Sequence, residues 1–246
     1  MTTRNRPEVI RPDWPAPANV RALVTTRQGG VSRGAWATFN LGAHCGDRAA
    51  AVHENRHRLR RLLPDEPMWL AQEHGNRVVS WRAGRERLPR ADAAVASGRH
   101  EVLAVLTADC LPVLFCDERG RQVAVAHAGW RGLAAGVLEQ TVAAMRAAPA
   151  AVLAWLGPAI GGSVYEVGSE VRDAVCDAHP SDADGFEPHG ERWLANLEHL
   201  AAARLRRCGL RQVYCSGSCT FTDAERFFSH RRDGVTGRMA SVIWLD

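Results

Sequence analysis

Short apolar runs separated by turn residues fill the middle of the chain. Between residues 68 and 127 the runs are MWLA, VVSW, DAAVAS, VLAVLT, PVLFC and VAVAH, with SGR and ERG among the turns. Apolar runs of this length, bounded by turn signals, are typical of buried strands. We therefore predict that this region forms strands of a mixed sheet, and that a helix follows from Gly132 to about Ala148.

The flanking regions add further strands and helices. Residues Ala22 to Thr26 predict a first strand, and VLAWLG, QVYCSG and MASVIWL predict three later ones. The spacing of apolar residues predicts a helix from Asp47, as its N-cap, to Leu63, and two more in VGSEVRDAVCDAH and ANLEHLAAARLRRCG. This order of elements indicates an α+β fold with mixed β-sheets, not the strict βαβ alternation of a dinucleotide-binding domain.

The chain divides into a short arm and one domain. Residues 1–20 contain four prolines and little periodicity, which predicts an extended N-terminal arm. Residues 21–246 contain no internal repeat, low-complexity segment or linker, and this length is enough to form one large core. We therefore predict a single catalytic domain over residues 21–246.

Composition and charge exclude several classes of protein. Hydrophobic residues make up 46% of the chain and charged residues 24%, which is ordinary for a soluble globular protein. The net charge of +4 is small and the basic residues are scattered, so we expect no nucleic acid partner. The N-terminus lacks the apolar run of a secretory signal, and no stretch is long and apolar enough to span a membrane. We predict a cytoplasmic protein.

The cysteine count also favours a cytoplasmic location. There are seven cysteines, an odd number without framework spacing, so structural disulfides are not expected and at least one thiol is free.

Three residues of metal-binding type have a similar sequence context. His127 ends the run VAVAH before GWRG, Cys110 follows an apolar run in TADCLP, and His74 follows MWLA in AQEHG. Taken singly, each has a structural explanation, since histidine can be buried against a carbonyl group and cysteine can pack as a small hydrophobe. Together, two imidazoles and one thiolate suit zinc, and three protein ligands leave a fourth position open, as in catalytic sites.

The same residues allow a metal-free site. Cys110 would then be a thiolate nucleophile, a histidine the base, and Asp109 or Asn40 the orienting group. Spacing alone does not separate the two schemes. Further along the chain, SHRRDGVTGR places Arg231, Arg232 and Arg238 close in sequence, where they could clamp an anion such as phosphate or form a solvated basic loop.

Six segments in a fixed order give the chain a family resemblance. They are FNLG, QEHG, TADCLPVLF, AHAGWRG, GPAIGGSVYEVG and FFSHRRDGVTGRMAS, within a stretch from TTRQGGVS to the C-terminal RMASVIWL. The chain thereby resembles the YfiH family, whose members are labelled laccase-domain proteins, multicopper polyphenol oxidases or purine nucleoside phosphorylases.

The resemblance implies both a fold and an activity. The fold would be a four-layer α/β/β/α sandwich, with zinc bound by His74, Cys110 and His127. The activity would be cleavage of purine nucleosides such as adenosine, inosine and methylthioadenosine by phosphate, accompanied by adenosine deamination. In this interpretation Arg231 and Arg232 contact phosphate, and Asn40 orients the site and its substrate.

Other activities remain open under the same resemblance. Laccase chemistry requires paired H-x-H ligands, and none of the ten histidines forms such a pair, so we expect copper to act only in vitro. A hydrolase that removes serine from a peptidoglycan precursor is a second alternative, and a scaffold protein with surface tryptophans is a third. Ala159 and Ser163 replace cysteines of the commoner family pattern, which affects the expected substrate detail and not the metal site.

Overall fold

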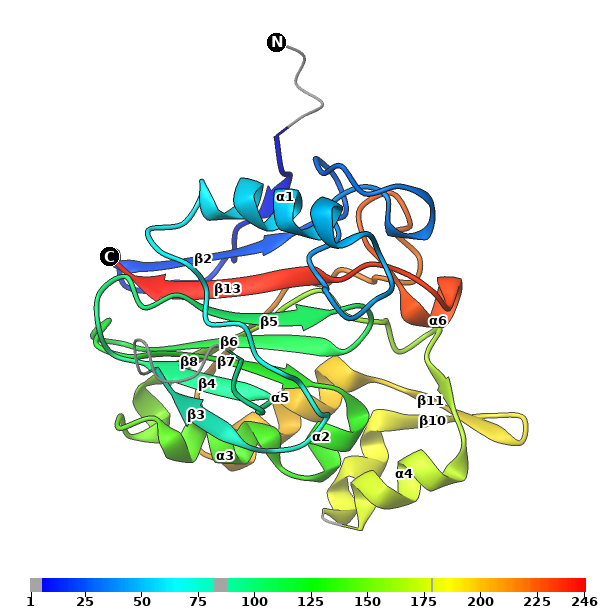
Figure 1. Cartoon of the computed structure of the whole chain (residues 1–246). Helices are drawn as coiled ribbons and strands as arrows, with labels where there is room; N and C mark the ends of the chain where they lie inside the picture. Colours follow the sequence, from blue (N-terminus) through cyan, green and yellow to red (C-terminus); the bar gives the residue numbers. More distant parts are fainter. Residues whose placement is uncertain (1–5, 82–87, 178) are drawn as a thin grey trace.

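The computed structural model describes residues 6–81, 88–177 and 179–246, so the first five residues of the predicted arm lie outside the described part. Two sheets are stacked on each other, with helices on their outer faces (Figure 1). The strands of the four-stranded sheet are, in spatial order, β1 (Val9–Ile10), β2 (Val20–Thr25), β13 (Met239–Leu245) and β5 (Leu103–Thr107). Those of the six-stranded sheet are β12 (Gln212–Cys215), β8 (Val152–Leu156), β6 (Leu111–Asp117), β7 (Val123–Ala128), β4 (Ala93–Ala96) and β3 (Val78–Ser80).

The strand directions confirm the predicted fold class and refine it. In the six-stranded sheet β12 pairs with β8 and β3 with β4 in parallel, whereas the other pairs are antiparallel, so this sheet is mixed. The four-stranded sheet is antiparallel throughout. A third, antiparallel sheet of β10 (Phe186–His189), β11 (Arg192–Ala195) and β9 (Glu166–Val167) was not predicted, because its short strands are rich in polar residues and lack an apolar run.

The helices are shorter than predicted. They are α1 (Ala49–Arg60), α2 (Trp130–Ala134), α3 (Val137–Ala144), α4 (Ser169–Cys176), α5 (Leu197–Arg207) and α6 (His230–Asp233). The single helix predicted after Gly132 is two helices, because Gly136 has a φ of +83° in the left-handed region and separates α2 from α3. The predicted N-cap is also wrong: Arg48 occupies that position, and Asp47 instead binds Ser32 and Asn40.

Both sheets are buried on both faces, which explains the continuous apolar runs in the sequence. In β6, Val113 and Phe115 face a core shared with α3 and α5, while Leu114 and Cys116 face the core between the sheets. A third core packs α1 against the outer face of the four-stranded sheet through Leu59 and neighbouring residues. Alternate side chains of one strand therefore serve two cores.

Two segments of the N-terminal half differ from the prediction. Met68 and Ala71 form only isolated bridges, to Leu103 and Arg90, so MWLA is not a strand. Within the predicted arm, Val9–Ile10 pairs with β2 and extends the four-stranded sheet by one edge strand.

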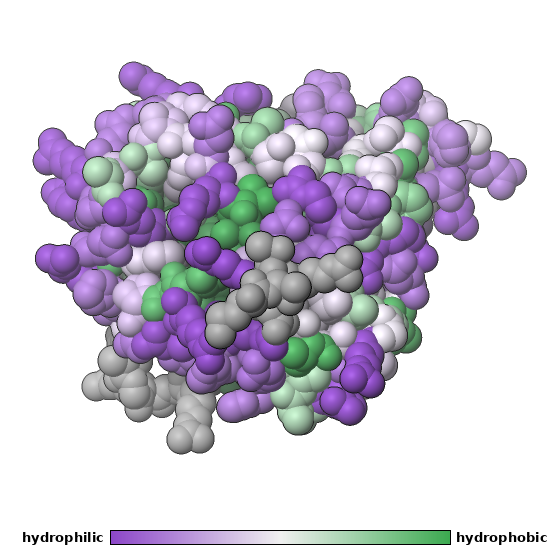
Figure 2. Space-filling model, turned by 90° about the horizontal axis from the view of Figure 1, so that it is seen from above, coloured by the Kyte–Doolittle hydropathy of each residue, from purple (hydrophilic) through white to green (hydrophobic). Residues whose placement is uncertain are grey.

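Among the described residues, the large hydrophobic side chains that are exposed are Leu88 and Val235. Seen from the α1 side, hydrophilic residues predominate and hydrophobic patches are small (Figure 2). Of the eight tryptophans three are buried and five half-buried, so some reach the surface as expected, but none is exposed enough to favour the scaffold alternative. No helix within the described ranges is long and apolar enough to cross a membrane.

Candidate metal centre and substrate pocket

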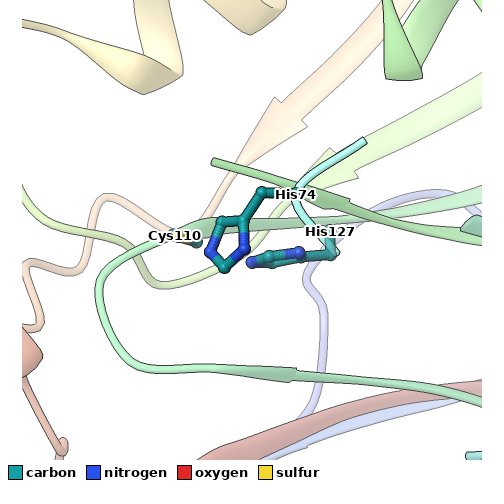
Figure 3. Close-up of side chains that lie close together, drawn as sticks. All are labelled: His74, Cys110 and His127. Atoms are coloured by element: carbon teal, nitrogen blue, oxygen red, sulfur yellow. The ribbon is translucent and has the colours of Figure 1, made fainter. Parts of the chain in front are cut away.

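The side chains of His74, Cys110 and His127 come together from three separate segments (Figure 3). Their ligand atoms all lie within 4.8 Å of one another. His127 is the penultimate residue of β7, Cys110 lies in the loop between β5 and β6, and His74 lies in a turn before β3. The expected position after a strand therefore holds for Cys110 and His127, but His74 follows an irregular segment.

The backbone around this triad has an uncommon conformation. His74 and Asp109 have φ values of +60° and +87°, in the left-handed region that non-glycine residues rarely adopt. Gly129 of AHAGWRG approaches the triad closely, since a Cβ there would lie 2.8 Å from the sulfur of Cys110 and 3.3 Å from the ring of His74. Glycine is therefore required at this position by the packing of the triad itself.

Asp92 holds two of the three triad residues and was missed by sequence reasoning. Its carboxylate, which is almost fully buried, accepts a hydrogen bond from Nδ1 of His127 at 2.8 Å. It also accepts the backbone N–H groups of Glu73, His74 and Gly75 at 2.8–3.1 Å. A carboxylate on Nδ1 fixes the imidazole so that Nε2 is free to bind a ligand. The available signal was a lone acidic residue opening the apolar run DAAVAS, a costly position without partners.

The triad favours a thiolate at neutral pH. Burial opposes ionisation of Cys110, but the neighbouring His127 and His74 outweigh it and lower the pKa of the thiol to about 6. For His127, burial lowers the pKa. The Cys110 thiolate and the Asp92 carboxylate have the opposite and larger effect, so the net shift of the pKa is upward. Thiolate is the form required both of a zinc ligand and of a nucleophile.

The donor set fits a divalent metal. One sulfur and two imidazole nitrogens within 4.8 Å of one another match the ligands of catalytic zinc sites, in which a fourth position is open. The metal-free scheme uses the same atoms, but its orienting group would be Asp92, which binds Nδ1 of His127, whereas Asn40 binds Asp47 and Asp109 binds Thr220.

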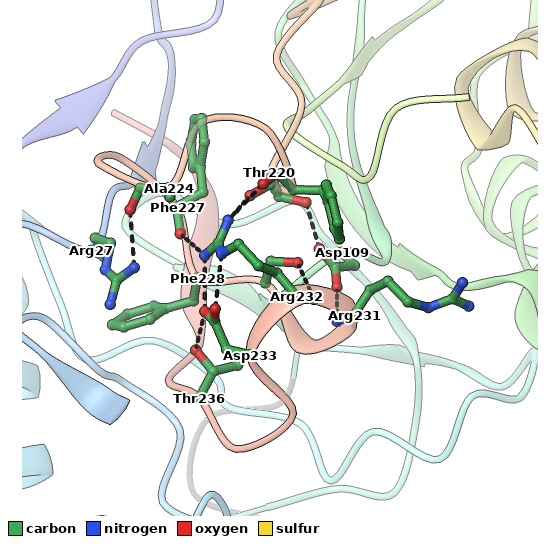
Figure 4. A network of polar contacts seen from close by, with 12 residues as sticks. Arg27, Asp109, Thr220, Ala224, Phe227, Phe228, Arg231, Arg232, Asp233 and Thr236 are labelled. Carbon is green, nitrogen blue, oxygen red and sulfur yellow. Dashed lines mark hydrogen bonds and ion pairs between the residues drawn. The ribbon is translucent and has the colours of Figure 1, made fainter. Parts of the chain in front are cut away.

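Asp109 and Asn40 connect loops, and neither is among the described residues that line the pocket over the triad. Asp109 accepts the hydroxyl of Thr220 and the backbone N–H of Arg231, both at 2.6 Å, and so ties the β5–β6 loop to the C-terminal segment (Figure 4). Asn40 is fully buried and accepts the backbone N–H groups of Gly42 and Arg238 at 2.9 Å. These contacts give both residues a structural role, and their expected catalytic roles stay predictions.

The two arginines expected to bind phosphate lie outside the triad's pocket. The guanidinium of Arg232 donates to the carbonyl groups of Thr220, Phe221 and Phe227 at 2.8–3.0 Å and pairs with Asp233 (Figure 4). Arg232 is therefore already satisfied by the protein. The side chain of Arg231 points away from this network, donates to the carbonyl group of Glu166 and stacks on Tyr165.

A pocket of about 740 Å³ opens over the triad. This size is within the usual range for sites that hold a small molecule. Besides the triad, its lining comprises the apolar or small residues Ala43, Trp69, Leu70, Ala71, Leu88, Leu106 and Ala108, the cationic or titratable residues His44, Arg56, Arg131, His230 and Arg238, and Gln72 and Thr107. The side-chain amide of Gln72 donates to the carbonyl group of Leu106 and accepts its backbone N–H. The residues described for this lining include no carboxylate.

Replacing Asp92 by asparagine is expected to lower zinc affinity about 10- to 100-fold, the usual effect of losing a carboxylate behind a histidine ligand. Asparagine keeps the shape but removes the charge that holds Nδ1 of His127. Chelator competition on the purified protein measures the affinity. Asp117→Asn is the matched control, because Asp117 is also buried and accepts backbone N–H groups, but at the end of β6. Zinc affinity unchanged in Asp92→Asn would contradict this role.

Comparisons with known proteins cover nearly the whole chain. A family model described as multi-copper polyphenol oxidoreductase laccase matches residues 21–246. The purine nucleoside phosphorylase YfiH of Escherichia coli (strain K12) is 49% identical over 240 residues, which cover 97% of this chain and 99% of that protein. A purine nucleoside phosphorylase of Pseudomonas aeruginosa is 50% identical over 238 residues, covering 96% and 98%.

Solved structures agree with this similarity. The crystal structure of a Neisseria meningitidis protein matches with a TM-score of 0.93 at 49% identity, covering 97% of this chain and 99% of that chain. The crystal structure of YlmD from Geobacillus stearothermophilus matches with a TM-score of 0.89 at 30% identity, covering 100% and 97%.

Proposed function

Because this chain belongs to the YfiH family, we propose that it is a zinc-dependent purine nucleoside phosphorylase. Its substrates would be adenosine, inosine and methylthioadenosine, each cleaved by phosphate to the free base and a sugar 1-phosphate. The observation that carries the proposal is a pocket that combines the His74, Cys110 and His127 triad with apolar and cationic walls. Seven free thiols are compatible with a cytoplasmic location.

The apolar part of the pocket lining suits the purine nucleoside, and the cationic part suits phosphate. Trp69, Leu70 and Leu106 offer apolar surface for the flat purine base. Arginine and histidine side chains on the same lining suit the negatively charged phosphate, and no carboxylate in the described lining repels it. The pocket therefore favours a reaction between a neutral aromatic ligand and an anion.

In the proposed reaction an oxygen of phosphate forms a bond to C1′ of the ribose while the bond from C1′ to the purine nitrogen breaks. The leaving base takes up a proton, and the sugar leaves as its 1-phosphate. The cationic side chains orient the phosphate and stabilise its charge during transfer. Zinc held by His74, Cys110 and His127 would supply a Lewis acid beside the substrate.

Adenosine deamination is the accompanying activity that we propose for this site. An open zinc site of this kind could activate water, as zinc deaminases do, although those enzymes use one histidine with two cysteines, or three cysteines. Those enzymes also use a glutamate as general acid and base, and the described lining has no such residue. We therefore place deamination second to phosphorolysis.

Copper chemistry has weaker support. Two imidazoles and a thiolate also bind copper, which is consistent with copper loading in vitro. Within residues 6–81, 88–177 and 179–246, however, the triad is the single group of at least three histidine, cysteine or acidic residues arranged to hold a metal. A laccase requires several copper ions, so we do not propose oxidation as the main activity.

Incubation of the zinc-loaded protein with adenosine, with and without phosphate, tests the proposal. We expect adenine and ribose 1-phosphate to form only when phosphate is present, as separated by chromatography. Inosine would indicate deamination, and adenine with free ribose in the absence of phosphate would indicate hydrolysis. If neither adenosine, inosine nor methylthioadenosine is turned over, the nucleoside proposal is wrong, and the peptidoglycan precursor becomes the substrate to test.

A further inference from the structure

Two arginines and a histidine from different segments form one corner of the pocket. His44 belongs to the loop after FNLG, Arg56 to α1 and Arg238 to the segment before β13, and all three line the cavity above the triad. Burial and then the positive charges of Arg238 and Arg56 lower the pKa of His44, which favours its neutral form, so the two arginines carry the positive charge of this corner. We call these three residues the cationic corner.

The two arginines of the cationic corner lack a carboxylate partner. Arg56 donates through Nε to the carbonyl group of Leu41 at 3.0 Å and stacks on Trp69, with Cζ 4.1 Å from the ring centroid. Burial lowers its pKa, although Glu66 opposes the shift. Arg238 donates through one terminal nitrogen to the carbonyl groups of Thr236 and Gly237. Among the residues that the structure describes, neither guanidinium forms an ion pair, and each has N–H groups beyond those that donate to these carbonyl groups.

Buried Asn40 places Arg238 in the pocket wall. Its side-chain oxygen accepts the backbone N–H groups of Gly42 and Arg238, which joins the two loops that carry His44 and Arg238. Gly42 packs directly on Arg238, because a Cβ at Gly42 would lie 2.9 Å from Cγ of that side chain. The structure therefore holds two half-buried guanidinium groups at fixed places in the pocket wall, where an anion would be a favourable partner.

The other arginines near the triad are less suited to an anion. Arg231 lines a neighbouring pocket of about 480 Å³, and Arg131 lines both pockets. The neighbouring pocket also contains Glu166 and Glu170, and its Arg192 lies 3.4 Å from the carboxylate of Glu166. Arg131 and Arg231 are exposed, so water screens their charge more than that of Arg56 and Arg238.

We propose that the cationic corner of His44, Arg56 and Arg238 binds a phosphoryl group, with Asn40 as its positioning residue. The inference rests on the proposed phosphorolysis and assigns its phosphate to these residues in place of Arg231 and Arg232. The terminal N–H groups of two guanidinium forks match the oxygens of a tetrahedral dianion. The ligand is either free phosphate or the phosphoryl group of a nucleoside 5′-monophosphate.

Calorimetric titration of inorganic phosphate into the zinc-loaded protein, without nucleoside, tests the corner directly. We expect Arg238→Gln and Arg56→Gln each to weaken phosphate binding about ten-fold or more, because each removes a charge-assisted contact. Arg238→Lys should recover part of the loss, since it restores the charge but not the fork. Arg192→Gln is the matched control and should bind phosphate as the unmodified protein does. Thermal unfolding of each variant checks that it is folded.

Kinetics separate binding of phosphate from a general structural defect. In the corner variants the KM for phosphate should rise by a similar factor, while the KM for adenosine changes less than about two-fold. Asn40→Ala should shift the KM for phosphate in the same direction through displacement of Arg238. Titration with adenosine 5′-monophosphate distinguishes the two sources: binding that depends on Arg238 and is displaced by phosphate assigns the corner to the substrate's own phosphoryl group.

Different experimental results would refute this inference and the proposed function. Phosphate binding that is lost in Arg131→Gln or Arg231→Gln, but kept in Arg56→Gln and Arg238→Gln, would overturn the corner and leave phosphorolysis standing. The absence of any phosphate binding at millimolar concentration would also overturn it. Conversely, Arg238-dependent phosphate binding without turnover of any purine nucleoside would support the corner and refute the proposed reaction.

Discussion

Replacing Cys110 by alanine is expected to lower kcat/KM for adenosine phosphorolysis about a thousand-fold or more, in the range seen when a catalytic group is removed. The substitution leaves two histidines where the site has three donors, and it removes the thiolate stabilised by His74 and His127. We expect the metal content of the purified variant, measured by mass spectrometry, to fall together with activity.

Cys110→Asp distinguishes a ligand from a nucleophile. A carboxylate can bind zinc, so the aspartate variant should retain part of the metal and of the activity if Cys110 is a ligand, and neither activity nor a covalent intermediate if it is a nucleophile. Cys215→Ser is the matched control, because Cys215 is an exposed thiol at the end of β12 and does not line the pocket. Full activity in Cys110→Ala would refute both roles.

Replacing Arg204 by alanine is expected to lower the free energy of unfolding by about 3–5 kcal/mol, the usual effect of breaking a buried ion pair from one side. The Arg204 side chain is 1% exposed and lies 2.7 Å from the fully buried carboxylate of Asp182. It also donates to the carbonyl groups of Leu133 and Val175 at 2.7 and 3.1 Å, which ties α2 and α4 to α5. The alanine variant leaves the carboxylate and both carbonyl groups without this donor.

Arg207→Ala provides the comparison for the same carboxylate. Arg207 also pairs with Asp182, but its side chain is one-third exposed, so its loss should cost about 1 kcal/mol or less. Urea denaturation of both variants, followed by circular dichroism, measures the difference. Equal destabilisation of Arg204→Ala and Arg207→Ala would show that burial does not determine the strength of this pair.

Sequence reasoning placed the strands well where the chain is buried on both sides. The runs VLAVLT, PVLFC, VAVAH, VLAWLG and MASVIWL all form strands, because two stacked sheets require continuous apolar segments. It failed for MWLA, which has the composition of a strand but pairs only at two isolated residues, Met68 and Ala71. Composition predicts burial, whereas a strand also needs a neighbouring strand within hydrogen-bonding distance.

In the candidate site, sequence reasoning identified the metal-binding residues but not their hydrogen-bond partners. By itself the sequence determined which side chains could bind a metal, because His74, Cys110 and His127 have the required chemistry and a shared context beside apolar runs and small residues. Only the tertiary structure decided which polar residues form hydrogen bonds with the residues of the site. Asp92 meets His127 across 35 positions, and Asn40 meets Arg238 across 198.

The arginines illustrate the physical reason. Arg231, Arg232 and Arg238 are nearly adjacent in sequence and chemically equivalent, yet one points into a neighbouring pocket, one is bound by three carbonyl groups and one lines the pocket of the triad. Side-chain chemistry is a property of the residue and is present in the sequence. The hydrogen-bond partner of a charged group depends on which distant segments the packed core brings beside it, and that is decided by the fold.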